Sequence, residues 1–335
     1  MENETRIVCP SCKGELEQLE INATRCQNCG LRYRTVFGIP DLRYPVNEVE
    51  NEPDRALVER LIAAYPDSSY LDLVELFFSS VDFSNIPEHL LSLYRCHRSR
   101  QLSRGSQFTN MFLSRLKEYY DVPDLAWSLE LGCGAGTGLV SLAHHCRHVI
   151  GIDPGLPQLI LARKLCAENN IQNVQLVQAY GQRLPFLDHC FSYVTGQNVL
   201  EHVFDIEAVL AEVVRVLRSG GCFAADSRNR YDLFFPEPHV QLRSVGLLPR
   251  AWANAYVRWR LGTSYETFHA RLLSYADLSR ALRNSFGDQY RIVMPRVSAY
   301  GMPKWDALLA AVERFEWLRR GLLVIFPTHL ALAQK

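Results

Sequence analysis

Two hydrophobic patterns alternate between residues 127 and 227. Short apolar runs at 148–153, 174–179, 191–196 and 222–227, and a further run that ends at Leu131, predict strands. Apolar residues at helical spacing lie between these runs, as at 157–169 and, most clearly, at 205–217. Strands that alternate with helices at this cadence predict an α/β fold with a doubly wound parallel sheet.

The flanking regions have helical patterns of their own. Residues 46–105 predict helices and loops, with one helix at 52–65 that ends at Pro66. Beyond the alternating region, we expect an amphipathic helix at 251–261, a helix at 274–286 capped by a serine, and a single helix at 303–320.

Composition narrows the class of protein. The 36 basic and 36 acidic residues balance, which argues against a protein whose main role is to hold a polyanion. No apolar run approaches the length of a membrane span, and no secretory signal pattern opens the chain. The ten cysteines lie mostly in apolar surroundings, as at Cys166 and Cys222, which suits a reducing compartment. We therefore expect a cytoplasmic protein without stable disulfides.

Two Cys-x-x-Cys pairs lie close to the start of the chain, separated by 13 residues. Pro10 and Gly14, and then Asn28 and Gly30, favour a tight turn at each pair, so that all four sulfurs can converge on one tetrahedral zinc ion. A segment of this size cannot bury enough apolar surface to fold alone, so a metal would supply its folding energy. The alternative is a pair of coincidental turns with free thiols. The predicted ligands of this closed, structural zinc ribbon are Cys9, Cys12, Cys26 and Cys29.

A glycine-rich turn follows the first strand of the alternating region. Gly132, Gly134 and Gly136 permit a sharp turn and a close approach of the backbone to a ligand. Glu130 precedes the turn, and Asp153 ends the next strand, 19 residues beyond Gly134, where a carboxylate can accept both hydroxyls of a ribose. A strict dinucleotide-binding pattern would need glycine at position 137, which is threonine.

These motifs resemble those of class I S-adenosylmethionine-dependent methyltransferases, and of the small-molecule group in particular. The resemblance rests on Glu-Leu-Gly-Cys-Gly-x-Gly at 130–136, Gly-Ile-Asp at 151–153, Leu-Pro-Phe at 184–186, Asn-Val-Leu-Glu-His-Val at 198–203 and Leu-Arg-x-Gly-Gly at 217–221. It implies a Rossmann-like sheet of seven strands, the last two at 290–295 and 328–335. Residues 1–45 resemble the short zinc ribbons that precede methyltransferase domains or that act as separate activators of tRNA methyltransferases. The resemblance therefore divides the chain into a ribbon at 1–45, a helical linker at 46–105 and a methyltransferase domain at 106–335.

The resemblance also assigns a cofactor site. Glu130 would orient the glycine loop and meet the amino group of S-adenosylmethionine, and Asp153 would bind its ribose. Tyr180 stands where the family commonly has an aspartate that accepts the adenine amino proton, so either its ring packs on the adenine or a backbone carbonyl takes that bond. The predicted cofactor-binding residues are Glu130, Gly132, Cys133, Gly134, Gly136, Asp153, Pro154, Gln182 and Asn198.

The acceptor of the methyl group is less clearly marked. His202 is the best candidate for a general base, with helix capping or packing as the alternative, and Glu201 is a candidate to hold the acceptor. Residues 228–270 form a long insertion rich in aromatic residues and arginine, which we call the lid. Its amphipathic helix suits an anionic or amphiphilic acceptor, such as a lipid-linked sugar, and peripheral contact with a membrane.

The leading prediction is therefore methyl transfer to a small molecule, directed to oxygen. One alternative is an RNA methyltransferase that grips RNA with the ribbon, supported by the basic strip at 95–104; another is a non-catalytic scaffold that binds the cofactor. The ribbon carries six basic and six acidic residues, so we expect no stable nucleic-acid binding and a protein or substrate surface as its partner. We also expect the Rossmann-like core to stay folded when residues 1–45 are deleted, because its sheet is complete without them.

Overall fold

The computed structural model describes residues 7–20, 22–45, 52–80, 86–268 and 270–335, apart from the side chains of 20, 52–54 and 94–104. The basic strip at 95–104 therefore lies outside the described side chains. A small antiparallel sheet opens the chain, with its strands in sequence order. These strands are β1 (Leu16–Glu20), β2 (Ala23–Cys26), β3 (Arg32–Val36) and β4 (Ile39–Pro40).

The large sheet has seven strands in the order β10-β11-β9-β8-β5-β6-β7. Only β11 runs antiparallel to its neighbours, so the predicted doubly wound, Rossmann-like sheet is confirmed. Its strands are β5 (Trp127–Leu131), β6 (His148–Asp153), β7 (Val174–Gln178), β8 (Phe191–Gly196), β9 (Leu217–Arg228), β10 (Tyr290–Val293) and β11 (Thr328–Gln334).

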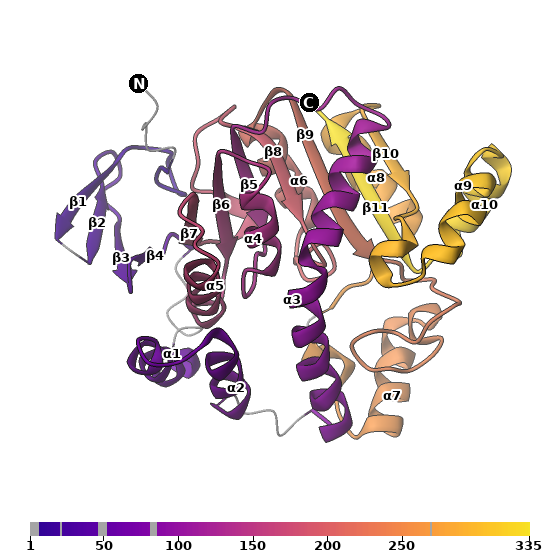
Figure 1. Cartoon of the computed structure of the whole chain (residues 1–335), viewed down its shortest axis with the longest axis horizontal. Helices are drawn as coiled ribbons and strands as arrows, with labels where there is room; N and C mark the ends of the chain where they lie inside the picture. The colour runs from indigo at the N-terminus through magenta and orange to yellow at the C-terminus, as the bar shows by residue number, and fades with distance from the viewer. Residues whose placement is uncertain (1–6, 21, 46–51, 81–85, 269) are drawn as a thin grey trace.

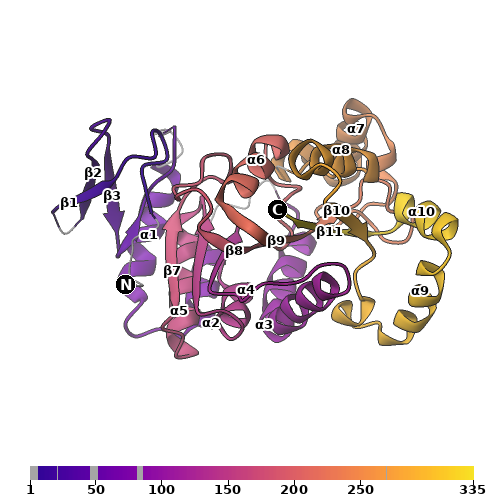
Figure 2. The same cartoon turned by 90° about the horizontal axis from the view of Figure 1, so that it is seen from above.

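Helices cover both faces of this sheet (Figures 1 and 2). One face carries α3 (Glu88–Lys117), α4 (Thr137–Ala143) and α5 (Leu156–Glu168), with α1 (Glu52–Ala64) and α2 (Tyr70–Ser80) packed against α5. The other face carries α6 (Ile206–Val216) and α8 (Tyr275–Phe286). Helix α3 is continuous through position 105, where the predicted linker ends. The side chains of Asp205 and Ser274 cap α6 and α8.

The lid has a small core of its own. It contains the short helix η3 (Val245–Leu247), α7 (Arg250–Leu261) and η4 (Tyr265–Phe268). Six buried side chains pack together within it: Val240, Leu242, Val245, Ala253, Val257 and Tyr265. The lid is therefore a packed unit beside the large sheet, and the amphipathic helix predicted at 251–261 is confirmed as α7.

The single helix predicted at 303–320 is wrong. The chain forms α9 (Asp306–Glu313) and α10 (Glu316–Ile325), separated by Phe315 in an extended conformation. This break redirects the chain so that Leu323 is buried in the core and the segment after α10 enters β11. A continuous apolar repeat cannot reveal such a turn, since each half reads as helix.

Candidate functional site

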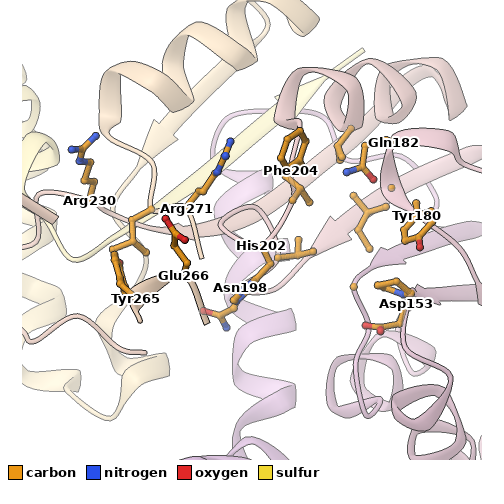
Figure 3. A pocket seen from close by; sticks show the side chains of 18 of the residues that line it. Asp153, Tyr180, Gln182, Asn198, His202, Phe204, Arg230, Tyr265, Glu266 and Arg271 are labelled. Atoms are coloured by element: carbon orange, nitrogen blue, oxygen red, sulfur yellow. The ribbon is translucent and has the colours of Figure 1, made fainter. Parts of the chain in front are cut away.

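A cavity of about 1030 Å³ opens at the carboxyl ends of the parallel strands. It lies where β5 and β8 are neighbours and the chain winds away on both sides, the usual ligand site of such sheets. Segments after β5, β6, β7 and β8 line one part, and the lid lines the rest. Figure 3 shows Asp153, Tyr180 and Gln182 at one end, Arg230, Tyr265 and Glu266 at the other, and His202 and Asn198 between them. We call these the strand end and the lid end.

The glycine loop after β5 needs residues without a side chain. Gly132 has φ of +59°, and a Cβ there would lie 2.5 Å from a methyl carbon of Val199. Gly136 has φ of +88°, and a Cβ there would lie 2.8 Å from Ala162 of α5. Both positions therefore exclude other residues by conformation and by space. The loop brings β5 close to α5 and leaves Gly132 at the cavity wall.

Asp153 links this loop to the next strand. One carboxylate oxygen accepts a hydrogen bond from the backbone N–H of Gly134 at 3.0 Å, and the other accepts one from Gly155 at 2.9 Å. The carboxylate also lines the cavity. Because each oxygen has a second lone pair, the group can hold the loop and still accept hydrogen bonds from a ligand.

Of the ten residues predicted to bind the cofactor or to act in catalysis, six line the cavity and four do not. Gly132, Asp153, Pro154, Gln182, Asn198 and His202 form part of its wall. Cys133 is buried in the core on the side of α4 and α5, so only its backbone is available near the loop. Gly134 and Gly136 shape the turn from behind. Tyr180, the departure from the family pattern, does line the strand end.

Glu130, the fourth predicted residue outside the cavity wall, is buried behind the glycine loop. It is 2% exposed, and its Oε2 atom has no hydrogen-bond partner among the described residues. Burial, assisted by the negative charge of Asp153, raises the pKa of Glu130 to about 8. A buried carboxyl with an unpaired oxygen beside a ligand cavity is suited to pair with a cationic group of the ligand.

The raised pKa predicts a pH dependence of stability. Between about pH 4.5 and pH 8 the folded protein keeps the Glu130 proton that the unfolded chain has lost, so the free energy of unfolding falls as pH rises through this window. Glu130→Gln should remove this part of the slope, on the order of 1 kcal/mol for each pH unit. Urea unfolding of the cofactor-free protein from pH 5 to pH 9 measures it.

Glu75→Gln, at an exposed position on α2, is the matched control and should leave the slope unchanged. The buried Glu201 and Asp226 have pKa values raised to about 7 and about 6 by burial, and they contribute a slope of the same sign in all variants. Parallel profiles for the wild type and Glu130→Gln would contradict the assignment.

His202 belongs to a group that the sequence analysis missed. Its ring meets that of His239 edge to face, with centroids 5.1 Å apart. His239 Nδ1 lies 2.6 Å from Glu237 Oε1, and the other oxygen of Glu237 accepts the backbone N–H groups of His239 and Val240. Glu237 is almost fully buried, so its carboxylate fixes the His239 ring behind His202.

Glu201 is not part of the cavity wall. It is 1% exposed and is absent from the cavity lining, while its backbone carbonyl accepts the N–H of Arg271 at 2.7 Å. Its carboxyl lies close enough to Asp226 for the two negative charges to raise its pKa further. The prediction that Glu201 contacts the acceptor is therefore not supported by its position.

The lid end of the cavity is positively charged. Arg230, Arg250 and Arg271 line it, against one carboxylate, Glu266. Arg230 and Arg250 donate to backbone carbonyls of the lid, so they are held in place without a neutralising partner among the described residues. Arg271 lies over the exposed Phe204 ring at 4.9 Å. Aromatic surface beside fixed cations suits a ligand that is both apolar and anionic.

The four N-terminal cysteines converge as predicted. Their sulfurs all lie within 4.8 Å of one another, with Cys9 to Cys29 at 3.7 Å and Cys12 to Cys26 at 3.4 Å. Thiolates in tetrahedral contact with zinc, at about 2.3 Å from the ion, are about 3.8 Å apart. Both the donor set and its spacing therefore fit a zinc ion.

The cysteine sheet packs on the large sheet at β7. Leu42 donates its N–H to the carbonyl of Gln178 at the end of β7, and Val8 donates to Pro185 at 2.9 Å. Lys13 Nζ donates to the carbonyl of Leu184 and forms an ion pair with Glu212. These contacts brace the segment 180–186, whose first residues line the strand end of the cavity. None of the described residues before position 45 lines the cavity itself, so a direct role for the ribbon as a cavity wall is not supported.

Within the part of the chain that the structure describes, no helix is both long and apolar enough to cross a bilayer.

Part of the chain is similar in sequence to known methyltransferases. Residues 129–225 match the protein family described as "Methyltransferase domain". The chain is 28% identical over 153 residues to the "Uncharacterized methyltransferase YcgJ" of Bacillus subtilis, which is 45% of this chain and 58% of that protein. It is 34% identical over 99 residues to the demethylmenaquinone methyltransferase of Listeria monocytogenes, 29% of this chain and 42% of that protein.

The chain thus spans little more than half of the first of these relatives and less than half of the second. The crystal structure of YcgJ superimposes with a TM-score of 0.43 at 17% identity, covering 68% of this chain and 98% of that one. A score of that size adds nothing to the fold, which the strand order itself establishes. Residues 129–225 of this chain are therefore similar in sequence to a methyltransferase domain.

Proposed function

We propose that the protein transfers a methyl group from S-adenosylmethionine to the oxygen of a small amphiphilic acceptor that carries an anionic group. One observation supports this most: a single cavity runs from Asp153 and Gln182 at the strand end to fixed arginines in the lid. Its volume of about 1030 Å³ is at the upper end of the usual range for ligand sites, about 300–1,000 Å³, and so has room for two ligands.

The residues at the strand end suit the cofactor. The Asp153 carboxylate can accept ribose hydroxyls, and the buried Glu130 can compensate the cofactor's ammonium group, directly or through water. Tyr180 and Gln182 line the place expected for the adenine. There the tyrosine ring would pack on the adenine, at the position where the family commonly has an acid that accepts a hydrogen bond. When bound, S-adenosylmethionine supplies a methyl group on a sulfonium sulfur, which is already activated for in-line displacement.

The residues at the lid end suit the acceptor. Arg230, Arg250 and Arg271 attract an anionic group, and the rings of Tyr265 and Phe204 offer apolar surface beside them. By name, the Listeria relative acts on demethylmenaquinone, a small-molecule acceptor, which is in line with this class.

His202 is the proposed general base. It lies between the two ends of the cavity, where it can take the proton of an acceptor hydroxyl as the oxygen attacks the methyl group. Glu237 and His239 are positioning residues: the carboxylate fixes His239, and the ring of His239 packs edge to face on His202. The proton can then leave to solvent, since the His202 side chain is exposed.

Substitution at this group tests the assignment. His202→Ala should lower kcat about 100-fold while leaving cofactor affinity unchanged, because a general base contributes on the order of 10²–10⁴ to the rate. Glu237→Gln should lower kcat less than tenfold and shift the pH profile of kcat, because the ring behind His202 loses its ionised partner. Steady-state rates from pH 5.5 to pH 9 measure both.

Rescue of the His202→Ala rate by added imidazole would support a proton-transfer role, and an unchanged kcat in His202→Ala would contradict it. If Glu237→Gln changes only thermal stability and leaves the pH profile in place, Glu237 serves the fold of the lid alone.

We further propose that Cys9, Cys12, Cys26 and Cys29 hold a structural zinc ion. The sulfurs are close enough for tetrahedral coordination, and the cluster is the kind of closed site that stabilises small sheets. A protein partner of the ribbon remains a proposal as well, supported by the outer face of the small sheet: Glu17, Arg25 and Arg32 lie there beside the exposed Leu19.

A screen for methyl transfer identifies the acceptor class. The full chain is incubated with cell extract and S-adenosylmethionine labelled on the methyl group, and the lipid, small-molecule, RNA and protein fractions are counted separately. We expect label in the lipid or small-molecule fraction, dependent on His202 and resistant to alkaline conditions that cleave RNA. Label confined to RNA would replace this proposal with the RNA methyltransferase, and cofactor binding without label in any fraction would favour the scaffold.

A further inference from the structure

Most of the protein's tryptophans lie on its surface. Trp252, Trp259, Trp305 and Trp317 are 69%, 77%, 57% and 73% exposed, whereas Trp127 is half-buried and stacks on His148. Isolated exposed apolar residues are ordinary, but several exposed tryptophans in one region mark a contact surface. Trp252 and Trp259 belong to the lid helix α7, Trp305 directly precedes α9, and Trp317 belongs to α10. These helices lie at the end of the molecule opposite the small sheet (Figures 1 and 2).

Helix α7 has two apolar faces. Ala253 and Val257 are buried in the lid core. Trp252 and Trp259, seven residues apart, lie together on a different face that no described residue covers. Arg258 and Arg260 flank Trp259 and are also exposed, and the guanidinium of Arg260 lies 5.6 Å from the Trp259 ring centre.

The α9–α10 segment, residues 306–325, also exposes apolar side chains. Helix α9 is rich in alanine and leucine, yet none of its residues is buried, and α10 buries only Leu323. Leu308, Phe315 and Trp317 are each more than half exposed. Figure 1 shows the two helices projecting from the body beside β11. An apolar helix pair that packs so little on its own protein is suited to pack on something else.

The charge of the lid indicates which kind of partner these exposed helices contact. Residues 238–265 carry four arginines and no acidic residue, in a chain whose basic and acidic residues balance. None of these arginines forms an ion pair with a described residue. Tryptophan and arginine together are typical of surfaces that lie in the interface of a bilayer, where the rings reach the acyl boundary and the cations meet lipid phosphates.

We propose that α7 and the α9–α10 segment dock the protein on the surface of a membrane that contains anionic lipid. Trp252, Trp259 and Trp317 enter the interface, and Arg258 and Arg260 meet the headgroups. Binding is peripheral, in keeping with the lack of a described helix that could span the bilayer.

The docked orientation gives the cavity access to the membrane. Arg250 and Ala253 of α7 line the cavity while the tryptophans of the same helix face outward. An amphiphilic acceptor can thus pass from the lipid phase along the lid to His202 without crossing water. This route rests on the proposed function, whereas the docking itself does not.

Flotation of the full chain with lipid vesicles tests the proposal. We expect flotation with phosphatidylcholine vesicles that contain phosphatidylglycerol, weak flotation with phosphatidylcholine alone, and a decline as salt is raised. The double variant Trp252→Ala/Trp259→Ala should lower the partition coefficient at least about tenfold. Arg258→Gln/Arg260→Gln should lower it about fivefold for each arginine, on anionic vesicles only.

Arg55→Gln/Arg60→Gln, at exposed positions on α1 away from α7, is the matched charge control and should float as the wild type does. Thermal unfolding of each variant should stay unchanged, since the replaced side chains are exposed. Failure of the wild type to float on anionic vesicles overturns the proposal, as does a stable dimer in sedimentation that the tryptophan variant dissociates. Flotation needs neither cofactor nor turnover, so a protein that floats but transfers no methyl group overturns the proposed function and leaves the docking surface standing.

Discussion

Asp153→Ala should weaken binding of S-adenosylmethionine by about 3 kcal/mol, on the order of 100-fold in Kd. The carboxylate has two tasks, and alanine abolishes both. Ribose hydroxyls lose a charged acceptor, and the backbone N–H groups of Gly134 and Gly155 lose the oxygens that hold the glycine loop in place. Because Gly132 and Gly136 have positive φ, the released loop has other conformations available that do not bind. Equilibrium dialysis with labelled cofactor measures the change.

Two further variants separate these tasks. Asp153→Asn keeps one oxygen as acceptor at similar volume, so we expect an intermediate loss of affinity, about tenfold. Asp288→Ala removes an exposed aspartate outside the cavity and should bind as the wild type does. If Asp153→Ala binds the cofactor with unchanged affinity, the strand end is not the cofactor site, and the assignment of Gln182 and Tyr180 is lost with it.

What could be predicted from the sequence is what the backbone constrains locally. Gly132 and Gly136 admit no side chain, and Asp153 ends a buried strand, so residue type and spacing alone place them at one sheet edge. The four cysteines were predictable for the same reason, since two turns suffice to bring the sulfurs together. The alternation of apolar runs with helical segments predicted a doubly wound parallel sheet, although it did not predict the order of the strands.

Features that depend on distant packing could not be predicted. The ring of His239, which is held by the carboxylate of Glu237, packs on His202 from a position more than 30 residues away, and no periodicity in the sequence indicates this contact. The direction of a side chain was equally hidden: Cys133 sits within the motif but faces the core. The break at Phe315 depends on how the chain returns to β11. Each is decided by tertiary contacts that override the local pattern.

The relation of the ribbon to the body was also beyond the sequence. The large sheet is complete without residues 1–45, as expected from its strand count. The hydrophobic core on one side of the sheet, however, includes residues of the ribbon. Buried in one cluster with Phe186 and the side chains beneath α6 are Cys9, Cys26, Tyr33 and Leu42. Removing the ribbon would expose this apolar surface and leave the edge of β7 uncovered. We therefore expect the ribbon to be part of the folded unit.

Loss of the zinc ion should therefore also weaken binding of the cofactor. Cys26→Ser should lower the zinc content from about one ion per chain to almost none, because a four-thiolate site depends on all of its ligands. The small sheet then loses its main source of folding energy, and with it the bonds that Val8 and Lys13 make to the segment 184–185. We expect a lower midpoint of thermal unfolding and cofactor affinity about tenfold weaker, since the segment that begins with Tyr180 is no longer braced.

Metal analysis, thermal unfolding and equilibrium dialysis on the same preparations follow the three effects in order. Cys166→Ala is the matched control: it removes a buried thiol outside the cluster, so it should cost some stability and retain the zinc ion. Full zinc occupancy in Cys26→Ser would contradict the proposed ligand set. A zinc-free Cys26→Ser protein that binds the cofactor as tightly as the wild type would instead show that the segment 180–186 keeps its shape without the ribbon, because the salt bridge of Arg215 with Glu212 and its bonds to the carbonyls of Leu184 and Phe186 hold that segment from the side of α6.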